Sequence, residues 1–392
     1  MTASARPADL PIRPAIAALE GSLIREVAEA NIGRDDVIAL WFGEPDEATP
    51  QFIKDAATAA LAADKVFYTQ NRGIPELRTA LARYATGLHG RPLDVDRVTV
   101  TCSGMNALML VSQALVEPGD NVVVVVPMWP NFRMTVAIMG GEARLVPLAP
   151  DEAGRWQLDL DRLFDACDGR TRAVFVNSPG NPTGWVMPAT QQAALLAEAR
   201  RRGLWVVSDE VYVRLAYDAP RAPSFLDVAA PDDRVIVVNS FSKSWSMTGW
   251  RLGWLTHPAA LGDAFSKLNE FNVAAPAAFV QHAGVVAVEQ GEPFVAAMVD
   301  RYRHNRDLVF QRLAGMRRVR LARPEGAFYA FFRLDGMSDS VATAKALIER
   351  TGVGLAPGLA FGPAGEGWLR LCFASRAETL SAALDRLQPE FD

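Results

Sequence analysis

Short runs rich in valine and isoleucine recur along the chain, and they restrict the fold more than any other feature. Six of them are RVTVTCS, NVVVVVP, RAVFVNSP, LWVVSDE, RVIVVNS and RLGWLTH, at residues 97–103, 121–127, 172–179, 204–210, 234–240 and 251–257. Continuous apolar runs of this length are typical of strands buried on both faces of a sheet. Amphipathic helical segments separate several of them, for example TQQAALLAEARRRG at 190–203. The pattern predicts an α/β fold with a mostly parallel central sheet.

The chain is long enough for more than one hydrophobic core. It has 392 residues, of which 50% are hydrophobic, and single cores stop growing at about 250–300 residues. Beyond residue 290 a long helical segment (294–316) precedes short strand-like pieces, which indicates a smaller α+β domain. We expect three parts: an N-terminal arm that also contributes to the small domain (1–45), a large domain (46–290) and a small C-terminal domain (291–392).

Charge and hydropathy argue against several classes of protein. The formal net charge is −5 and no long basic run occurs, so binding to nucleic acid or to an anionic membrane surface is not expected. No stretch approaches the roughly 18 consecutive apolar residues of a membrane-spanning helix. The start of the sequence, MTASARPADLPIRP, lacks the apolar region of a signal peptide. We therefore expect a cytoplasmic protein.

Cysteines and histidines give no sign of a metal site. The cysteines are an odd number at wide spacing, which suits free thiols in a reducing compartment (Cys102, Cys167 and Cys372). The histidines are scattered without the spacing of metal ligands (His89, His257, His282 and His304). No metal is expected.

Polar or conformationally special residues follow four of the apolar runs. Ser103 and Gly104 follow the first, 177–184 the third, Asp209 nearly ends the fourth, and 240–243 the fifth. In sheets of this kind ligands bind outside the carboxyl ends of the strands. We expect these residues to converge on one edge of the sheet.

The stretch NSFSKSWSMTGWRLGW (239–254) places Lys243 at this edge. A lone lysine is more often an ordinary residue with a solvated head group, but an amine at a ligand site can form a Schiff base. Arg251 is either a surface cation or a rigid guanidinium that holds a phosphate. Ser240 and Ser242 add hydroxyl groups. A lysine nucleophile beside a phosphate anchor is what pyridoxal 5′-phosphate requires.

This cofactor makes further demands that the sequence can meet. Its ring nitrogen needs a buried carboxylate, and Asp209 is placed for this, although a lone aspartate is more often a cap or part of an ion pair. Its phosphate suits a helix start, and a Gly-containing turn leads into a helical segment at 103–115. Asn181 and Tyr212 could bind the ring oxygen, and Trp129 could stack on the ring; alone, Asn181 is a turn former and Trp129 core filling.

Together these motifs resemble the class I and II aminotransferases, fold type I of the pyridoxal-phosphate enzymes, typified by aspartate aminotransferase. The resemblance covers nearly the whole chain and includes WFGEPDEATP, FYTQNRGIPELR, CSGMNAL, VPMWPN, VNSPGNPTG, VSDEVY, SFSKSWSMTGWRLGW and WLRLCFA. It implies a large cofactor-binding domain around a mostly parallel sheet and a smaller α+β domain.

The resemblance also implies roles for individual residues. Lys243 would form the Schiff base and then move the proton at the substrate α-carbon, and Asp209 would pair with the pyridinium nitrogen. Asn181 and Tyr212 would contact the phenolic oxygen. Arg370 would clamp the substrate α-carboxylate, with Asn181 and Gly43 nearby.

The phosphate would be held at the opposite end of the cofactor. The implied set is Ser240, Ser242, Arg251 and the 103–105 turn, with Tyr68 of a partner subunit in a homodimer that shares its active sites. Family members often carry a polar side chain where this sequence has Met105, so here only the main chain of Met105 could serve the phosphate.

The implied activity is transfer of an amino group from an L-amino acid to a 2-oxo acid in two half-reactions. A C–S β-lyase, or other carbanion chemistry on the same scaffold, is the alternative. A transcription regulator is a more distant one, since no basic helix-turn-helix segment precedes Trp41. The substrate side chain is left open: either Arg72 reads an acidic group, or an apolar pocket forms from Trp41, Phe42, Trp185, Phe328 and Tyr329. Broad or apolar specificity is slightly favoured.

Overall fold

A large central sheet organises the computed structural model, which describes residues 12–151 and 154–392. Within these residues the sheet has seven strands in the order β2-β10-β9-β8-β7-β3-β4. Their bounds are β2 (Val98–Thr101), β3 (Asn121–Val126), β4 (Glu142–Pro147), β7 (Thr171–Asn177), β8 (Trp205–Asp209), β9 (Val235–Ser240) and β10 (Gly253–Thr256). Only β10 is antiparallel to its neighbours. The predicted mostly parallel sheet is confirmed.

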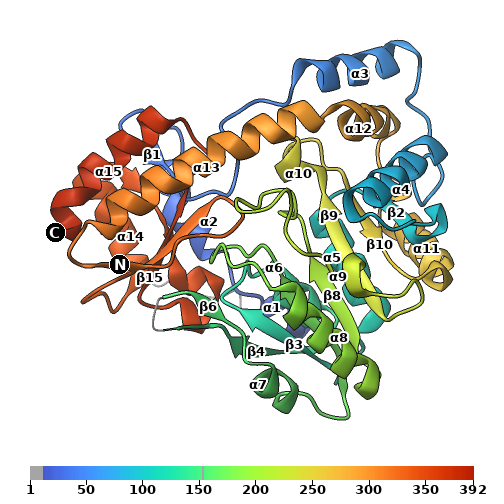
Figure 1. Cartoon of the computed structure of the whole chain (residues 1–392), viewed down its shortest axis with the longest axis horizontal. Coiled ribbons are helices and arrows are strands. Elements are labelled where there is room, and N and C mark those ends of the chain that lie inside the picture. Colours follow the sequence, from blue (N-terminus) through green and yellow to red (C-terminus); the bar gives the residue numbers. More distant parts are fainter. Residues whose placement is uncertain (1–11, 152–153) are drawn as a thin grey trace.

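Helices cover both faces of this sheet (Figure 1). Side chains alternate between faces along a strand, so Val122 and Val124 of β3 pack in one core and Val123 and Val125 in another. The first core includes α5 (Gly104–Leu115), α6 (Asn131–Ile138) and α11 (Gly262–Val273), and the second includes α8 (Ala189–Arg202). A third core joins β2 and β10 to α3 (Gln51–Ala62), α4 (Pro75–His89) and α12 (Ala278–Gln290).

A second, antiparallel sheet lies toward the C-terminus. Its order is β11-β12-β15-β14, from β11 (Val319–Leu321), β12 (Tyr329–Leu334), β15 (Trp368–Cys372) and β14 (Ala356–Pro357). It packs with α13 (Glu292–Ala314), α14 (Ser340–Thr351) and α15 (Ala377–Phe391). Helix α13 runs from beside α12 to this small sheet, and thus links the two parts of the molecule (Figure 1). The α+β character predicted beyond residue 290 is present.

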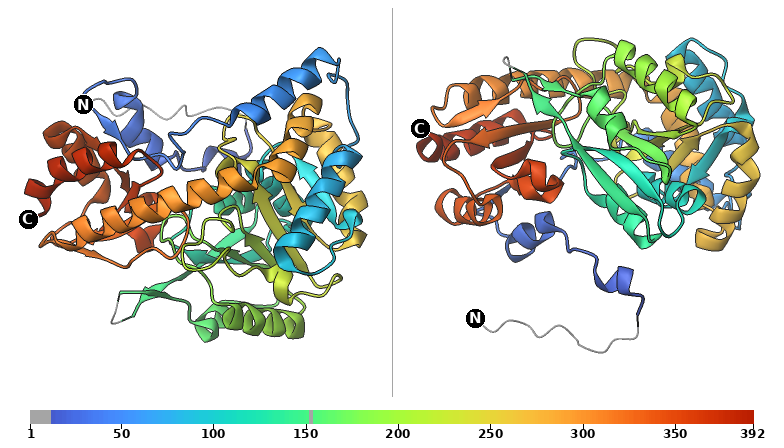
Figure 2. Two further views of the ribbon diagram at one scale, coloured as in Figure 1. Left: turned by 45° about the horizontal axis from the view of Figure 1, so that its top comes forward. Right: turned by 90° about the horizontal axis from the view of Figure 1, so that it is seen from below.

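The N-terminal segment also reaches the small sheet. It carries α1 (Pro14–Ala17), α2 (Leu23–Ala28) and β1 (Ile38–Ala39). Helix α2 contacts β14 of the small sheet, whereas β1 pairs in parallel with β13 (Val353–Gly354) as a separate two-stranded sheet. Helices α1 and α2 extend to one side of the large sheet (Figure 2). The remaining short elements are β5 (Ala149–Pro150), β6 (Trp156–Gln157), α7 (Leu160–Asp165), α9 (Phe225–Val228) and α10 (Phe241–Ser244). No helix in the described parts of the chain has the length and hydropathy to cross a membrane.

Candidate active site

A pocket of about 580 Å³ lies at the carboxyl ends of β7, β8 and β9, where the small sheet meets the large one. Most of the residues proposed from the sequence line it: Gly43, Gly104, Met105, Trp129, Asn181, Asp209, Tyr212, Ser240, Ser242, Lys243, Arg251 and Arg370. Ser103 immediately precedes the start of α5. Residues from distant parts of the sequence therefore meet at one sheet edge, as expected from the apolar runs.

Lys243 enters this pocket from α10, the short helix that follows β9. Its Nζ donates a hydrogen bond to the Gly43 carbonyl at 2.6 Å. The amine also lies 5.7 Å from the ring centre of Tyr212 and 5.6 Å from that of Phe328. Burial among these groups lowers the pKa of Lys243 to about 8. A neutral amine, the form that acts as nucleophile and base, is thus accessible near neutral pH.

Asp209 ends β8 and is 6% exposed. Its Oδ1 accepts a hydrogen bond from Val211 N at 3.2 Å, and within the described chain no arginine or lysine forms an ion pair with it. Burial raises its pKa to about 7. A buried carboxylate in this condition is stabilised by a cationic or N–H-bearing partner in the pocket.

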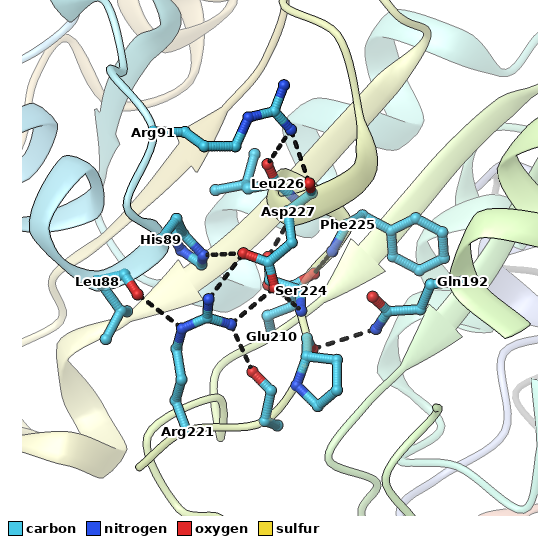
Figure 3. Close-up of polar contacts among 12 residues, drawn as sticks. Leu88, His89, Arg91, Gln192, Glu210, Arg221, Ser224, Phe225, Leu226 and Asp227 are labelled. Carbon is cyan, nitrogen blue, oxygen red and sulfur yellow. Dashed lines mark hydrogen bonds and ion pairs between the residues drawn. The ribbon is translucent and has the colours of Figure 1, made fainter. Parts of the chain in front are cut away.

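A polar network surrounds Glu210, the residue that follows β8 (Figure 3). Glu210 accepts hydrogen bonds from Ser208 Oγ at 2.9 Å and from Phe225 N at 3.0 Å, and its burial raises its pKa. Close by, Asp227 binds both terminal nitrogens of Arg221 at 2.7 and 2.8 Å and lies 2.8 Å from His89 Nδ1. The sequence analysis did not single out this network, although Glu210 directly follows Asp209.

Arg370 projects from β15 and is almost fully buried. Its Nη1 donates to Asn181 Oδ1 at 2.9 Å, and its Nη2 donates to the Trp41 carbonyl. The guanidinium lies between the rings of Tyr329 and Phe361, 4.6 and 4.9 Å from their centres. Its Nε has no hydrogen-bond partner within the described residues. These contacts fix a planar cation whose geometry matches a carboxylate.

Two tyrosines, Tyr212 and Tyr329, line the pocket together with Arg370. The hydroxyl groups of Tyr212 and Tyr329 are 2.7 Å apart, and burial raises both pKa values, so both stay protonated. A Cβ on Gly43 would lie 2.0 Å from Tyr329 Oη. Glycine is therefore required at this position for the chain to pass the tyrosine and present its carbonyl to Lys243.

The other end of the pocket is rich in hydrogen-bond donors. Ser240 Oγ lies 3.0 Å from Ser242 Oγ, and Arg251 donates to the Thr248 carbonyl at 2.6 Å while its side chain stays exposed. Ser103 caps α5, its Oγ accepting from Asn106 N at 2.9 Å. A Cβ on Gly253 would lie 2.7 Å from Gly104 N, so this glycine lets β10 approach the helix start. The set is suited to an anion.

Met105 brings a thioether to this end of the pocket. Asn131 Nδ2 lies 3.3 Å from its Sδ. The side chain offers an anion no donor, and only the backbone N–H of Met105 is available to it, as the sequence indicates.

Two predicted residues lie outside the pocket of their own chain. Tyr68 is 94% exposed. Arg72 is half-buried, and it donates to Thr99 Oγ1 at 3.1 Å and to the carbonyls of Asp96 and Val98 at 2.6 and 3.1 Å. These bonds favour a structural role for Arg72 over recognition of a substrate.

The aromatic residues proposed for an apolar pocket divide into two groups. Phe42 and Tyr329 line the pocket. Trp41, Trp185 and Phe328 are buried in the adjoining core, where Trp41 contributes its carbonyl to Arg370. The sequence alone could not show which of these aromatic residues line the pocket and which are buried in the core.

A family model described as Aminotransferase class I and II matches residues 35–387. The chain belongs to this family. It is 36% identical over 354 residues to the aspartate aminotransferase of Thermotoga maritima, covering 90% of this chain and 91% of that one. It is 35% identical to the aspartate/prephenate aminotransferase of Thermus thermophilus, covering 90% of each chain. A crystal structure of aspartate aminotransferase from T. maritima superposes with a TM-score of 0.90 at 34% identity, over 97% of this chain and 99% of that one.

The resemblance stated from the motifs is thereby confirmed, and so is the fold. The protein is an aminotransferase, and its family uses pyridoxal 5′-phosphate. The names of the relatives give no support to the C–S β-lyase alternative.

The pocket fits this cofactor at three separate points. The buried Asp209 lacks a cation in the described structure and would gain one from a protonated ring nitrogen. The serines, Arg251 and the start of α5 would meet the phosphate. Lys243 lines the same pocket with an amine of lowered pKa. The donor set therefore matches the charges of the cofactor, negative at one end and positive at the other.

Proposed function

We propose that Lys243 is the lysine that holds the cofactor and that the pocket exchanges an amino group between an L-amino acid and a 2-oxo acid at this residue. One observation carries the proposal. The same pocket contains the Lys243 amine, whose pKa is about 8, and the buried Asp209 carboxylate, whose pKa is about 7 and which forms no ion pair within the described residues. Perturbed groups of complementary charge in a cleft are typical of catalytic sites.

The proposed division of labour follows from what each side chain can reach. Pyridoxal 5′-phosphate, when bound, supplies the carbonyl that takes the amino group and the ring that withdraws electrons. Asp209 would keep the ring nitrogen protonated, and Asn181 and Tyr212 would donate hydrogen bonds to the ring oxygen. Ser240, Ser242 and Arg251 would hold the phosphate together with the backbone of the 103–105 turn, and Trp129 would stack on the ring.

Arg370 would orient the substrate. Its guanidinium is fixed by Asn181 and Trp41, so an α-carboxylate bound to it would be held in one plane. Lys243 Nζ would then act as the base that moves a proton between the substrate α-carbon and the cofactor. The burial of Tyr212, Tyr329 and Arg370 excludes water from this region, which strengthens each charged contact.

We also propose a homodimer in which Tyr68 completes the phosphate end of a partner's pocket. Phe67, Tyr68 and Phe271 are large side chains exposed by 78%, 94% and 83%. A second groove, of about 930 Å³, shares Thr248 and Arg251 with the phosphate end of the pocket. Exposed aromatic residues of this size are characteristic of protein interfaces.

The domain limits and the location also stay proposals. We divide the chain at residues 45 and 290, so that 46–290 binds the cofactor. The three cysteines are free thiols, which supports the reducing environment of the cytoplasm.

Substitution Lys243→Ala tests the assignment. We expect the purified variant to lose the absorbance of the covalently held cofactor and to transfer no amino group from an L-amino acid in a single half-reaction. Lys267→Ala is the matched control, because Lys267 is an exposed lysine paired with Asp263 at 2.6 Å. Normal turnover by the Lys243→Ala protein would overturn the proposal.

A further inference from the structure

Among the residues that the structure describes, four cationic side chains line the active-site pocket, and three of them have a place in the proposed function. Lys243, Arg251 and Arg370 are assigned to the cofactor, its phosphate and the substrate α-carboxylate. The fourth is Arg25, which comes from the N-terminal helix α2. It lies in no motif of the sequence analysis.

Helix α2 holds Arg25 in a defined place. Ser22 caps the helix, its Oγ accepting from Arg25 N at 3.3 Å, and Ile24, Val27 and Ala28 are buried against the small sheet. The helix contacts β14, whose Ala356 is paired in register with Arg370. Arg25 and Arg370 therefore project from one packed unit, which sets the relative position of their backbones.

The guanidinium of Arg25 is not committed to another group. No carboxylate in the described parts of the chain forms an ion pair with it, and its side chain is exposed. Arg133, which lines an adjoining groove together with Arg25, is already paired with Glu20 at 3.0 Å. An unpaired arginine at the wall of a binding pocket is available to a ligand anion.

Arg25 also lies where the pocket adjoins a second groove. A groove of about 1000 Å³ adjoins the pocket, and Ser22, Arg25 and Asn131 line both spaces. The pocket also has an apolar wall, to which Ile24, Met105 and Leu108 belong. A substrate held by Arg370 through its α-carboxylate would point its side chain along this wall toward Arg25 or remain against the apolar part.

We propose that Arg25 binds the distal acidic group of a dicarboxylic amino acid or 2-oxo acid, and that it gives the enzyme its activity on acidic substrates. Apolar substrates use the same wall without contacting Arg25, since its exposed side chain can remain in solvent. The inference rests on the proposed function, because it assumes that Arg370 holds the α-carboxylate. Arg25 would thus supply the cation for acidic substrates in place of Arg72, whose side chain donates to Thr99 Oγ1 and to the carbonyls of Asp96 and Val98.

The test compares single half-reactions of the holoenzyme with individual amino donors. Glutamate and aspartate are compared with leucine and phenylalanine in wild type, Arg25→Ala and Arg25→Lys, so that no dicarboxylic acceptor is present. Loss of a charge-assisted hydrogen bond should lower kcat/KM for the acidic donors about 10- to 100-fold in Arg25→Ala. Leucine and phenylalanine should change by less than about 2-fold, since they leave Arg25 in solvent. Arg25→Lys should recover part of the acidic activity.

A binding measurement supplies a readout that does not depend on turnover. Succinate and butyrate have the same length and differ by one carboxylate, and calorimetric titration of the holoenzyme gives the affinity of each. Arg25→Ala should weaken succinate and leave butyrate unchanged. Arg133→Ala is the matched control, because it removes an arginine from the same groove that is already ion-paired.

Three results would overturn the inference. They are an equal loss for acidic and apolar donors, no loss for either, and a drop in succinate affinity as large in Arg133→Ala as in Arg25→Ala. Failure of the proposed function itself would look different, because the wild type would then convert none of the four donors.

Discussion

Replacement of Asp209 by asparagine should stabilise the cofactor-free protein and weaken its hold on the cofactor. In the folded chain burial raises the pKa of Asp209 from its usual 3.8 to about 7. The folded state therefore takes up a proton that the unfolded chain has already lost above pH 4. Ionising this buried carboxylate without a partner opposes folding, and asparagine removes that charge.

The size of the effect follows from the shift. A difference of about 3 pKa units at about 1.4 kcal/mol each gives a penalty of about 4 kcal/mol above pH 7. The penalty should be near zero at pH 4 and grow by roughly 1.4 kcal/mol per pH unit up to pH 7. Unmet hydrogen bonds of the new amide reduce the gain by about 1–3 kcal/mol at every pH, so the pH dependence is the sharper measure.

Urea unfolding of cofactor-free wild type and Asp209→Asn at pH 5, 6, 7 and 8 measures this. Both proteins should be at one concentration, since a dimer unfolds in a concentration-dependent way. Asp227→Asn is the control of opposite sign. Although burial opposes it, hydrogen bonds from His89 and Arg221 hold the pKa of Asp227 at about 2, so its charge stabilises the fold throughout this range. Asp227→Asn should lose stability at all four pH values.

The reasoning would be refuted by a difference between wild type and Asp209→Asn that does not change from pH 5 to pH 8. It would also be refuted if Asp209→Asn bound the cofactor as tightly as wild type in an absorbance titration. In that case the carboxylate would have no cationic partner in the complex, and its burial would serve no binding function.

Two further substitutions test the geometry. Gly43→Ala should lower activity by at least about 10-fold, because the new Cβ would lie 2.0 Å from Tyr329 Oη and displace the carbonyl that binds Lys243. Adding Tyr329→Phe to this variant should restore part of the lost activity. Full activity of Gly43→Ala alone would contradict the close approach. Tyr68→Ala should weaken cofactor binding about 10-fold through one lost hydrogen bond to the phosphate. Mixing it with inactive Lys243→Ala protein should yield active hybrid dimers, because one pocket then has both Lys243 and the partner's Tyr68. A monomer in sedimentation would rule out the shared site.

Much of the fold could be predicted because the central strands are buried on both faces. Their apolar runs are continuous; β3, β8 and β9 fall within them, as does β7 apart from its first residue, Thr171. The strand β4 was missed because it lies at the sheet edge, where five of its six residues are partly or fully exposed and include Glu142 and Arg144. The antiparallel direction of β10 was also not predicted, since an apolar run has no direction.

The site divides in the same way. Lys243 and Asn181 follow strands and Asp209 ends one, so their convergence could be inferred from topology. Arg25 could not, because α2 is a short helix whose place depends on packing against the small sheet. Arg72 was ambiguous for the opposite reason: a motif drew attention to it, whereas its bonds to the backbone of Asp96 and Val98 exist only in the folded chain.

The separation of Lys243 from Asp209 decides what the pocket can do without its cofactor. The two side chains have opposite charges and share one cavity, yet the lysine bonds to the Gly43 carbonyl and forms no ion pair with the carboxylate. An ion pair would raise the pKa of the amine and lower that of the acid, leaving a protonated lysine that cannot act as nucleophile. Burial is the main cause of both shifts, and without an ion pair each group keeps its perturbed pKa. A ligand with an aldehyde at one point and a basic ring nitrogen at another would react with the amine and pair with the carboxylate, so both groups favour binding of that ligand.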